Sequence, residues 1–190
     1  MWKTCCIALI AGRWFVEYNE IKSKPVGEIA GFLKNHGKPI KEMTIFDFIE
    51  NNGVALNSVN GIYIFRNHDS FYYIGKCSSR AFVERIPSHF DTREGGWFNT
   101  LLKYLCEYKH ADSCFDAAMF AKNNLFLILI QIQVSDLKNY STICSGVEKL
   151  LRLLLQPKLN SYKNKMQETF NQNHELDNLP FEEAIKKIRA

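Results

Sequence analysis

Residues 61–75 read GIYIFRNHDSFYYIG, with a Gly-Ile-Tyr triplet at one end and a Tyr-Ile-Gly triplet at the other. The apolar and aromatic residues of both runs are those that strands prefer. Asn67 to Ser70 supply a polar turn between them, so the segment predicts a β-hairpin. Packing against a core would explain most of this pattern without any function.

The tyrosines of the two triplets are not explained by packing alone. Alternation along the second strand predicts that Tyr73 shares a face with Phe71 and Gly75. Cross-strand pairing then brings the Tyr73 hydroxyl near the Tyr63 hydroxyl. Two phenols beside glycines predict a polar notch on an otherwise apolar sheet.

The two triplets resemble those of the GIY-YIG nuclease family, and further parts of that family's pattern follow them. A helix predicted over residues 80–90 carries Arg85, twelve residues after Tyr73 and slightly further along than the family's usual interval. His89 lies four residues after Arg85, which is one helical turn and places both on one face. Pro87 between them is expected to weaken or bend the helix.

A second helix supplies a glutamate, and an asparagine follows it. Glu148 opens the run EKLLRLLLQPKLN, in which Pro157 ends the helix and Asn160 lies twelve residues after Glu148. The leucines predict a buried face, and a glutamate in such a helix is almost never fully buried unless it is paired or bound to a metal. This run is similar to the nuclease domain of bacterial excision-repair endonucleases.

The resemblance implies an endonuclease that hydrolyses phosphodiester bonds in DNA with a single divalent cation, Mg²⁺ or Mn²⁺. Glu148 is then the metal ligand, and Tyr63 is the general base or the group that positions the water. Tyr73 would orient the water or a phosphate oxygen, and Asn160 would fix the site by hydrogen bonds. His89 is the competing base, because the ordinary pKa of histidine lies close to neutrality. The sequence leaves the choice between Tyr63 and His89 open.

These residue types suit the chemistry of phosphodiester hydrolysis. Negative charge accumulates on the phosphate oxygens and on the leaving oxygen, so the site needs cations. Arg85 offers a planar fork of donors to those oxygens, and Lys76 offers a second point charge. A Mg²⁺ ion is commonly held by one or two carboxylates together with substrate phosphate, so Glu148 alone is chemically sufficient.

We expect an α+β domain over residues 58–165, in which a small three-stranded antiparallel sheet is flanked by helices. Residues 97–108 have apolar side chains at helical spacing, and residues 125–134 form a continuous apolar run typical of a central strand. Residues 112–116 are interpreted as a loop between these elements.

The chain is predicted to add a segment on each side of this domain. Residues 1–57 form an N-terminal extension with a hairpin of strands 4–10 and 13–18 and two short helices, the first opened by Pro25. Residues 166–190 form a polar segment and a C-terminal amphipathic helix.

Composition agrees with one compact unit. The chain has 190 residues, of which 46% are hydrophobic, so it can bury a full core. A net charge of +4 is compatible with a polyanionic partner. The six cysteines include no Cys-x-x-Cys pair, which argues against structural zinc and favours reduced thiols in the cytoplasm. The sequence has no long apolar run, so we expect no membrane span.

Three hypotheses about the function remain open at this point. The first is a metal-dependent endonuclease, most similar to the small restriction-type members of the family. The second is a catalytically inactive nucleic-acid-binding module with the same fold, and the third is an unrelated α+β domain. A double-strand cut by an enzyme with one site needs a homodimer or two successive nicks. The DNA sequence or structure recognised and the biological pathway are not encoded in these patterns.

Overall fold

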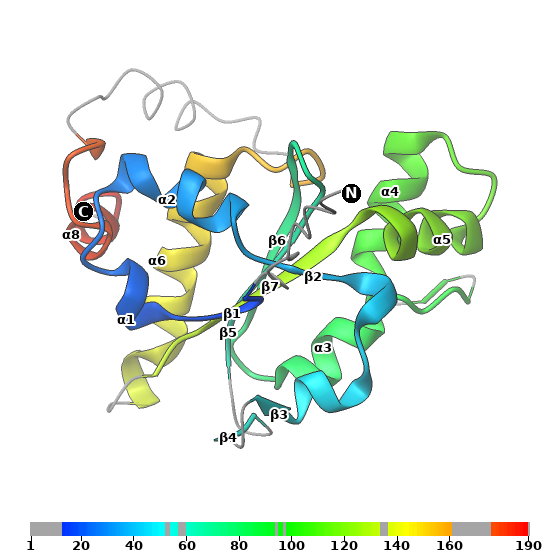
Figure 1. The fold of residues 1–190 in the computed structure, drawn as a ribbon, viewed down its shortest axis with the longest axis horizontal. Coiled ribbons are helices and arrows are strands. Elements are labelled where there is room, and N and C mark those ends of the chain that lie inside the picture. The colour runs from blue at the N-terminus through cyan, green and yellow to red at the C-terminus, as the bar shows by residue number, and fades with distance from the viewer. Residues whose placement is uncertain are drawn as a thin grey trace, which may run out of the picture.

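A five-stranded mixed β-sheet runs through the middle of the fold, with helices on both faces (Figure 1). The structure is a computed structural model that describes residues 13–51, 54–56, 60–93, 95–96, 98–133, 137–160 and 176–189. The strand order is β1-β7-β5-β6, and β2 also pairs with β7. The strands are β1 (Phe15–Glu17), β2 (Lys38–Pro39), β5 (Gly61–Arg66), β6 (Phe71–Cys77) and β7 (Phe126–Gln131).

The predicted hairpin of residues 61–75 is confirmed as β5 and β6, and the α+β class is confirmed with it. β5 lies between β6 and β7 and is antiparallel to both. The sheet is wider than the three strands predicted, because β1 joins β7 in parallel and β2 joins it antiparallel.

The helices divide between the two faces of the sheet (Figure 1). One face is covered by α1 (Tyr18–Ile21), α2 (Val26–Lys34), α6 (Leu137–Leu155) and α8 (Phe181–Lys187). The other carries α3 (Phe82–Ser88), α4 (Thr100–Lys109) and α5 (Cys114–Asn124). Short 3-10 helices η1 (Ile40–Glu42) and η2 (Ile45–Phe48) and the small ribbon of β3 (Glu50–Asn51) and β4 (Val54–Ala55) complete the described elements.

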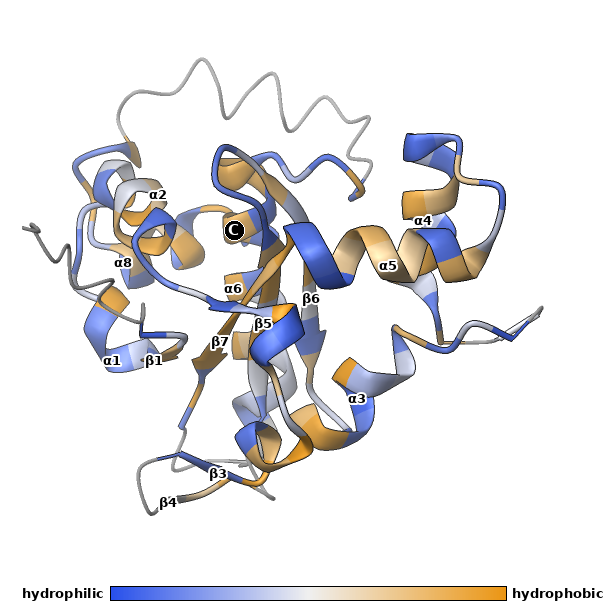
Figure 2. Ribbon diagram, turned by 45° about the vertical axis from the view of Figure 1, so that its right-hand side comes forward, coloured by the Kyte–Doolittle hydropathy of each residue, from blue (hydrophilic) through white to orange (hydrophobic). Residues whose placement is uncertain are grey.

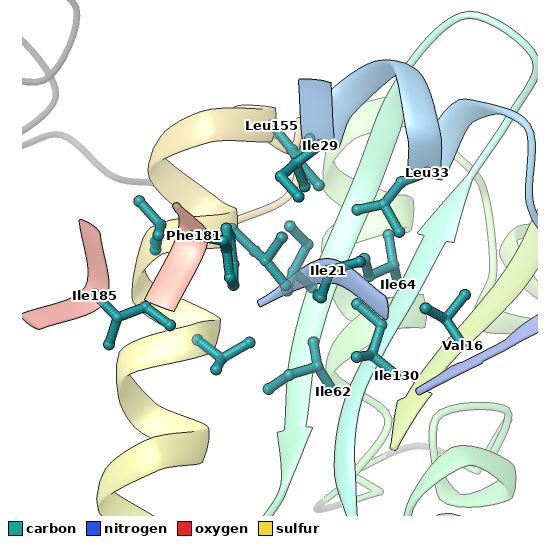
Figure 3. Close-up of a cluster of buried hydrophobic side chains, with 14 of the residues drawn as sticks. Val16, Ile21, Ile29, Leu33, Ile62, Ile64, Ile130, Leu155, Phe181 and Ile185 are labelled. Carbon is teal, nitrogen blue, oxygen red and sulfur yellow. The ribbon is translucent and has the colours of Figure 1, made fainter. Parts of the chain in front are cut away.

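Two apolar cores lie on opposite sides of the sheet because residues alternate along the central strand. Ile62 and Ile64 of β5 belong to the first core, with α2, α6 and α8, and Figure 3 shows them beside Ile21 and Phe181. Tyr63 and Phe65 of the same strand belong to the second core, with α3, α4 and α5. All of β5 is buried, and Figure 2 shows the apolar character of the neighbouring β7. The central strand therefore stabilises both layers at once.

One detail of the predicted alternation is wrong. Phe65 pairs with Tyr73, but the next residue of β5, Arg66, pairs with Phe71, so Tyr72 is an extra residue in β6. Such a bulge reverses the alternation beyond it. Tyr72 and Tyr73 consequently both face the second core, and Phe71 faces the first core instead of sharing the face of Tyr73.

Part of the predicted N-terminal extension, residues 1–57, contributes to the same sheet. The predicted strand 13–18 is shorter, because α1 begins at Tyr18, and it pairs with β7. The predicted strand 4–10 lies outside the described residues. The helix opened by Pro25 is confirmed as α2. The division of the chain at residue 57 stays a prediction.

Two further predictions concern the loop at residues 112–116 and the C-terminal helix. The loop predicted at 112–116 is too long, because α5 begins at Cys114. Ser113 caps this helix by accepting a hydrogen bond from the backbone N–H of Asp116. The C-terminal helix is confirmed as α8, and Pro180 is its N-cap residue. Phe181 and Ile185 of α8 pack into the first core.

The glycine of the first triplet is required by the close approach of β7. A Cβ atom at Gly61 would collide with the carbonyl oxygen of Ile130. We expect Gly61→Ala to lower the free energy of unfolding by about 1–3 kcal/mol, because backbone must move to make room. Urea denaturation measures the change.

Gly31 provides the matched control for this substitution. It is an exposed residue inside α2, and a Cβ there would meet nothing within 4 Å. Gly31→Ala is expected to raise the free energy of unfolding by about 0.5–1 kcal/mol, because alanine is the better helix former. Equal effects of the two substitutions would contradict the role given to Gly61.

Candidate active site

A pocket of about 400 Å³ opens beside the second triplet and gathers side chains from both faces of the hairpin and from two helices. Its lining residues are Tyr63, Tyr73, Gly75, Lys76, Cys77, Ser78, Ser79, Arg80, Arg85, Phe98, Glu148 and Arg152. Five of the predicted site residues are among them, namely Tyr63, Tyr73, Lys76, Arg85 and Glu148. Two predicted residues, His89 and Asn160, lie outside the lining.

The glycine of the second triplet makes room for the tyrosine of the first. Tyr63 and Gly75 are paired across the hairpin, and a Cβ atom at Gly75 would collide with the Tyr63 ring and hydroxyl. The Tyr63 ring is stacked near the Tyr73 ring, with 6.2 Å between the ring centroids. The polar notch predicted from the two triplets thus has Tyr63 as its floor.

His89 lies beneath Tyr63, away from the pocket. Its Nε2 atom is 2.7 Å from the Tyr63 hydroxyl, and its Nδ1 atom accepts a hydrogen bond of 3.3 Å from the backbone N–H of Leu101. A backbone N–H can only donate, so the neutral imidazole carries its proton on Nε2. His89 therefore donates to the Tyr63 oxygen. The hydroxyl proton of Tyr63 therefore points away from His89.

Burial controls the protonation of this pair. His89 and Tyr63 are both fully buried. Burial, together with the positive charge of Arg85, lowers the pKa of His89 to about 3. Burial also raises the pKa of Tyr63 well above its ordinary value, although Arg85 counteracts part of this effect. Burial likewise raises the pKa of Tyr73, against the opposing charges of Arg152 and Arg85. At neutral pH the site contains a neutral imidazole and two neutral phenols.

Arg85 reaches the pocket from α3, one turn before His89. The helix contains Pro87 and ends at Ser88, three residues after Arg85. His89 is the residue that caps this helix, and its backbone N–H donates to the carbonyl of Ile86. The short helix α3 therefore places Arg85 at the pocket and His89 beneath Tyr63.

Glu148 is held between two cations. Its Oε1 accepts a hydrogen bond of 2.6 Å from Arg152, one turn later in α6. Its Oε2 lies 3.6 Å from the Nζ atom of Lys76, which donates to the Ser145 hydroxyl at 2.7 Å. The Glu148 side chain is 13% exposed. A carboxylate in a buried helix is thus paired, as the sequence required.

Arg152 was missed by sequence reasoning. Its Nε and Nη2 atoms donate to the carbonyl of Ile74 at 3.2 and 2.9 Å, so it ties α6 to the edge strand as well as binding Glu148. The spacing of Arg152 four residues after Glu148 is the signal that could have found it, because such residues are neighbours on a helix.

Asn160 holds the edge strand from outside the pocket. Its side-chain Oδ1 accepts a 2.6 Å hydrogen bond from the Ile74 N–H, and its Nδ2 donates to the Ile74 carbonyl at 3.0 Å. The backbone N–H of Leu159 also donates to the Tyr72 carbonyl at 2.8 Å. The segment after α6 therefore covers the open edge of β6, which carries Tyr73 on one face of the strand.

The described lining residues are strongly cationic overall. Four of them, Lys76, Arg80, Arg85 and Arg152, carry positive charge, and only Glu148 carries negative charge. A pocket of this composition attracts an anion with several oxygens, and the guanidinium groups match the geometry of a phosphate.

Glu148 is the residue of the lining that could offer carboxylate oxygens to a divalent cation. Among the described residues, no three His, Cys, Asp or Glu side chains gather in a metal-binding arrangement. Mg²⁺ does not need such a cluster, because waters and substrate phosphate complete its oxygen shell. Glu148 supplies the carboxylate oxygens, and its contact with Lys76 at 3.6 Å is longer than a hydrogen bond. Carboxylate oxygens are the ligands that a hard cation takes, and Glu148 is the carboxylate among the lining residues.

Comparison of the chain with known protein families, curated proteins and solved structures gives no significant match. None of the helices in the described parts of the chain is both long and apolar enough to cross a membrane.

Burial of the His89 imidazole predicts that the free energy of unfolding falls in acid. Below about pH 6.5 the unfolded chain binds a proton at His89, and the folded chain does not until about pH 3. His89 should therefore reduce the free energy of unfolding by up to about 1.4 kcal/mol for each pH unit lost in this window. We expect His89→Gln to flatten the slope of stability against pH between pH 6 and pH 4.5.

Urea denaturation at a series of pH values measures this slope. The matched control is His68→Gln, which replaces an exposed histidine of the hairpin turn and should keep the slope of the parent chain. A slope that is equally steep in the His89→Gln variant would show that His89 is not held neutral.

Proposed function

We propose that this chain is a divalent-metal-dependent endonuclease of the GIY-YIG type, which hydrolyses phosphodiester bonds in DNA. The observation that supports this best is the convergence of Tyr63, Tyr73, Arg85 and Glu148 on one cationic pocket. These residues come from β5, β6, α3 and α6, and an unrelated domain would have no reason to bring them together. Arg85 and Glu148 side chains that reached separate surfaces, and not one shared pocket, would have excluded the proposal.

The surrounding architecture agrees with the same proposal. The GIY and YIG triplets lie on adjacent antiparallel strands, β5 and β6, and β7 extends the sheet on the other side of β5. The arginine helix and the glutamate helix lie on opposite faces of that sheet. Both reach the pocket at the carboxyl end of β6, where the strand runs into residues 78–80.

The cations bind and orient the scissile phosphate in this proposal. Arg85 contributes two parallel N–H donors to the non-bridging oxygens, and Lys76 contributes a movable point charge. Negative charge grows on these oxygens in the transition state, so cations in contact with them stabilise the transition state more than the ground state. Lys76 would exchange its 3.6 Å contact with Glu148 for a phosphate oxygen.

Glu148 is the residue that would hold the metal ion. A divalent cation there supplies charge neutralisation on the phosphate and lowers the pKa of a bound water. Arg152 keeps the Glu148 carboxylate in one orientation through its 2.6 Å hydrogen bond. Partners of this kind orient a metal ligand and raise its affinity for the ion.

Tyr63, rather than His89, is the group that contacts the attacking water. Tyr63 lines the pocket, and His89 is buried behind it and donates to the Tyr63 oxygen. That hydrogen bond fixes the phenol ring, so the Tyr63 hydroxyl can orient a water in line with the departing oxygen. His89 is a positioning residue, because its proton already lies on the nitrogen that faces Tyr63.

Metal-dependent nicking tests the proposed function. Supercoiled plasmid is incubated with the protein in Mg²⁺ and in chelator, and the Glu148→Gln variant is assayed beside it. We expect nicked circles to appear only with Mg²⁺, and the variant to be at least about 100-fold slower, since one metal ligand is lost.

The control variant is Glu28→Gln, which changes an exposed glutamate of α2 and should cut at the parent rate. Plasmid that is retarded but uncut by the parent chain would favour the inactive binding module. Nicking that persists unchanged in Glu148→Gln would contradict the assignment of Glu148.

The roles of Tyr63 and His89 are separated by a second experiment. We expect Tyr63→Phe to lower kcat by about 10²-fold, because the attacking water loses the hydroxyl that orients it. His89→Gln keeps a donor toward Tyr63 and should lose less. Because the pKa of His89 lies near 3, the pH profiles of kcat/KM between pH 5 and pH 8 should have the same shape in parent and His89→Gln. An acid limb that disappears in the variant would identify His89 as the base.

A further inference from the structure

Phe98 is an exposed aromatic residue at the pocket that the proposed chemistry does not use. It precedes α4, lines the same pocket as Tyr63 and Glu148, and is 40% exposed. Exposed apolar side chains are common on protein surfaces. Phe98 differs from these because it borders a pocket lined by four cationic side chains.

Two guanidinium groups lie against the Phe98 ring. The Cζ atom of Arg80 is 4.4 Å from the ring centroid, and the Cζ atom of Arg85 is 5.9 Å from it. Both distances fall within the range of cation–π attraction, about 6 Å. Arg85 therefore connects the phosphate-binding part of the pocket to the aromatic ring. A nucleotide with its phosphate on Arg85 would carry its base toward Phe98.

The Arg80 guanidinium lies over one face of the Phe98 ring and adds a second flat surface to it. It is exposed and belongs to the segment after β6, and its guanidinium is planar and able to stack. Flat aromatic and guanidinium surfaces bind unpaired nucleobases in proteins that recognise single-stranded nucleic acid. Such stacking accepts any base, because every base has a π-face.

We propose that Phe98 and Arg80 form a stacking platform for one unpaired nucleobase beside the scissile phosphate. The preferred substrate is then DNA in which the nucleotide next to the cut is unpaired. This inference rests on the proposed nuclease function. A base inside a duplex is already stacked on both sides and must be extruded before it can reach the platform, which favours mismatched, bulged or single-stranded sites.

A merely structural role for Phe98 would have a different consequence. If the ring only supported the side chains of Arg80 and Arg85, its loss would slow the cutting of every substrate equally. A stacking platform instead changes the ratio of rates on unpaired and paired DNA. That ratio is the quantity to measure.

The experiment compares two labelled duplexes of the same sequence, one fully paired and one with a single-nucleotide bulge, under the metal conditions of the plasmid assay. We expect the parent chain to have a kcat/KM at least about five-fold higher on the bulged duplex, the lower end of what one base–aromatic stack contributes. Phe98→Leu should bring the ratio of kcat/KM on bulged and paired DNA close to one. Phe98→Trp should keep this ratio near the parent value.

Phe115→Leu is the matched control, because Phe115 is a 61% exposed phenylalanine of α5 and lies outside the pocket lining. It should keep the parent ratio. A ratio that is unchanged in Phe98→Leu, or a parent chain that cuts both duplexes equally, overturns the platform and leaves the nuclease proposal intact. A parent chain that cuts neither duplex nor plasmid overturns both.

Discussion

The Tyr63 ring occupies the space that any side chain at position 75 would need, and the candidate site depends on that contact. Cross-strand pairing sets Tyr63 over Gly75, so the hydroxyl lies at the floor of the pocket beside the end of β6. His89 can reach this hydroxyl only because α3 crosses the same face of the sheet. The same helix then places Arg85 at the pocket.

The neutral side chains of the site are more deeply buried than the charged ones. His89 and Tyr63 are fully buried, and desolvation keeps both neutral. The cations and Glu148 line the open part of the pocket, where water reduces the cost of charge. In the proposed function, a phosphate entering this site would meet charged donors first and the buried Tyr63 phenol beneath them. Under that proposal, the charged side chains bind the phosphate and the neutral Tyr63 hydroxyl orients the attacking water.

The parts of the fold that depend on local sequence patterns could be predicted from the sequence. The hairpin, the helix after Pro25 and the buried strand of residues 125–134 follow from composition and periodicity. The extra residue at Tyr72 could not be foreseen, because alternation alone does not reveal a bulge. The parallel pairing of β1 with β7 is likewise set by tertiary packing, and α5 was missed because its periodicity is weak. Within the site, helical spacing could have identified Arg152 beside Glu148.

The most direct measurement is a crystal structure of the protein with Mn²⁺ and a DNA strand that carries a non-hydrolysable phosphate analogue. The proposed function predicts an anomalous Mn²⁺ peak bonded to a Glu148 carboxylate oxygen, with the analogue between that ion and Arg85 and the Tyr63 hydroxyl facing it. A metal ion bound elsewhere, or DNA that leaves this pocket empty, would contradict the assignment of the pocket as the catalytic centre.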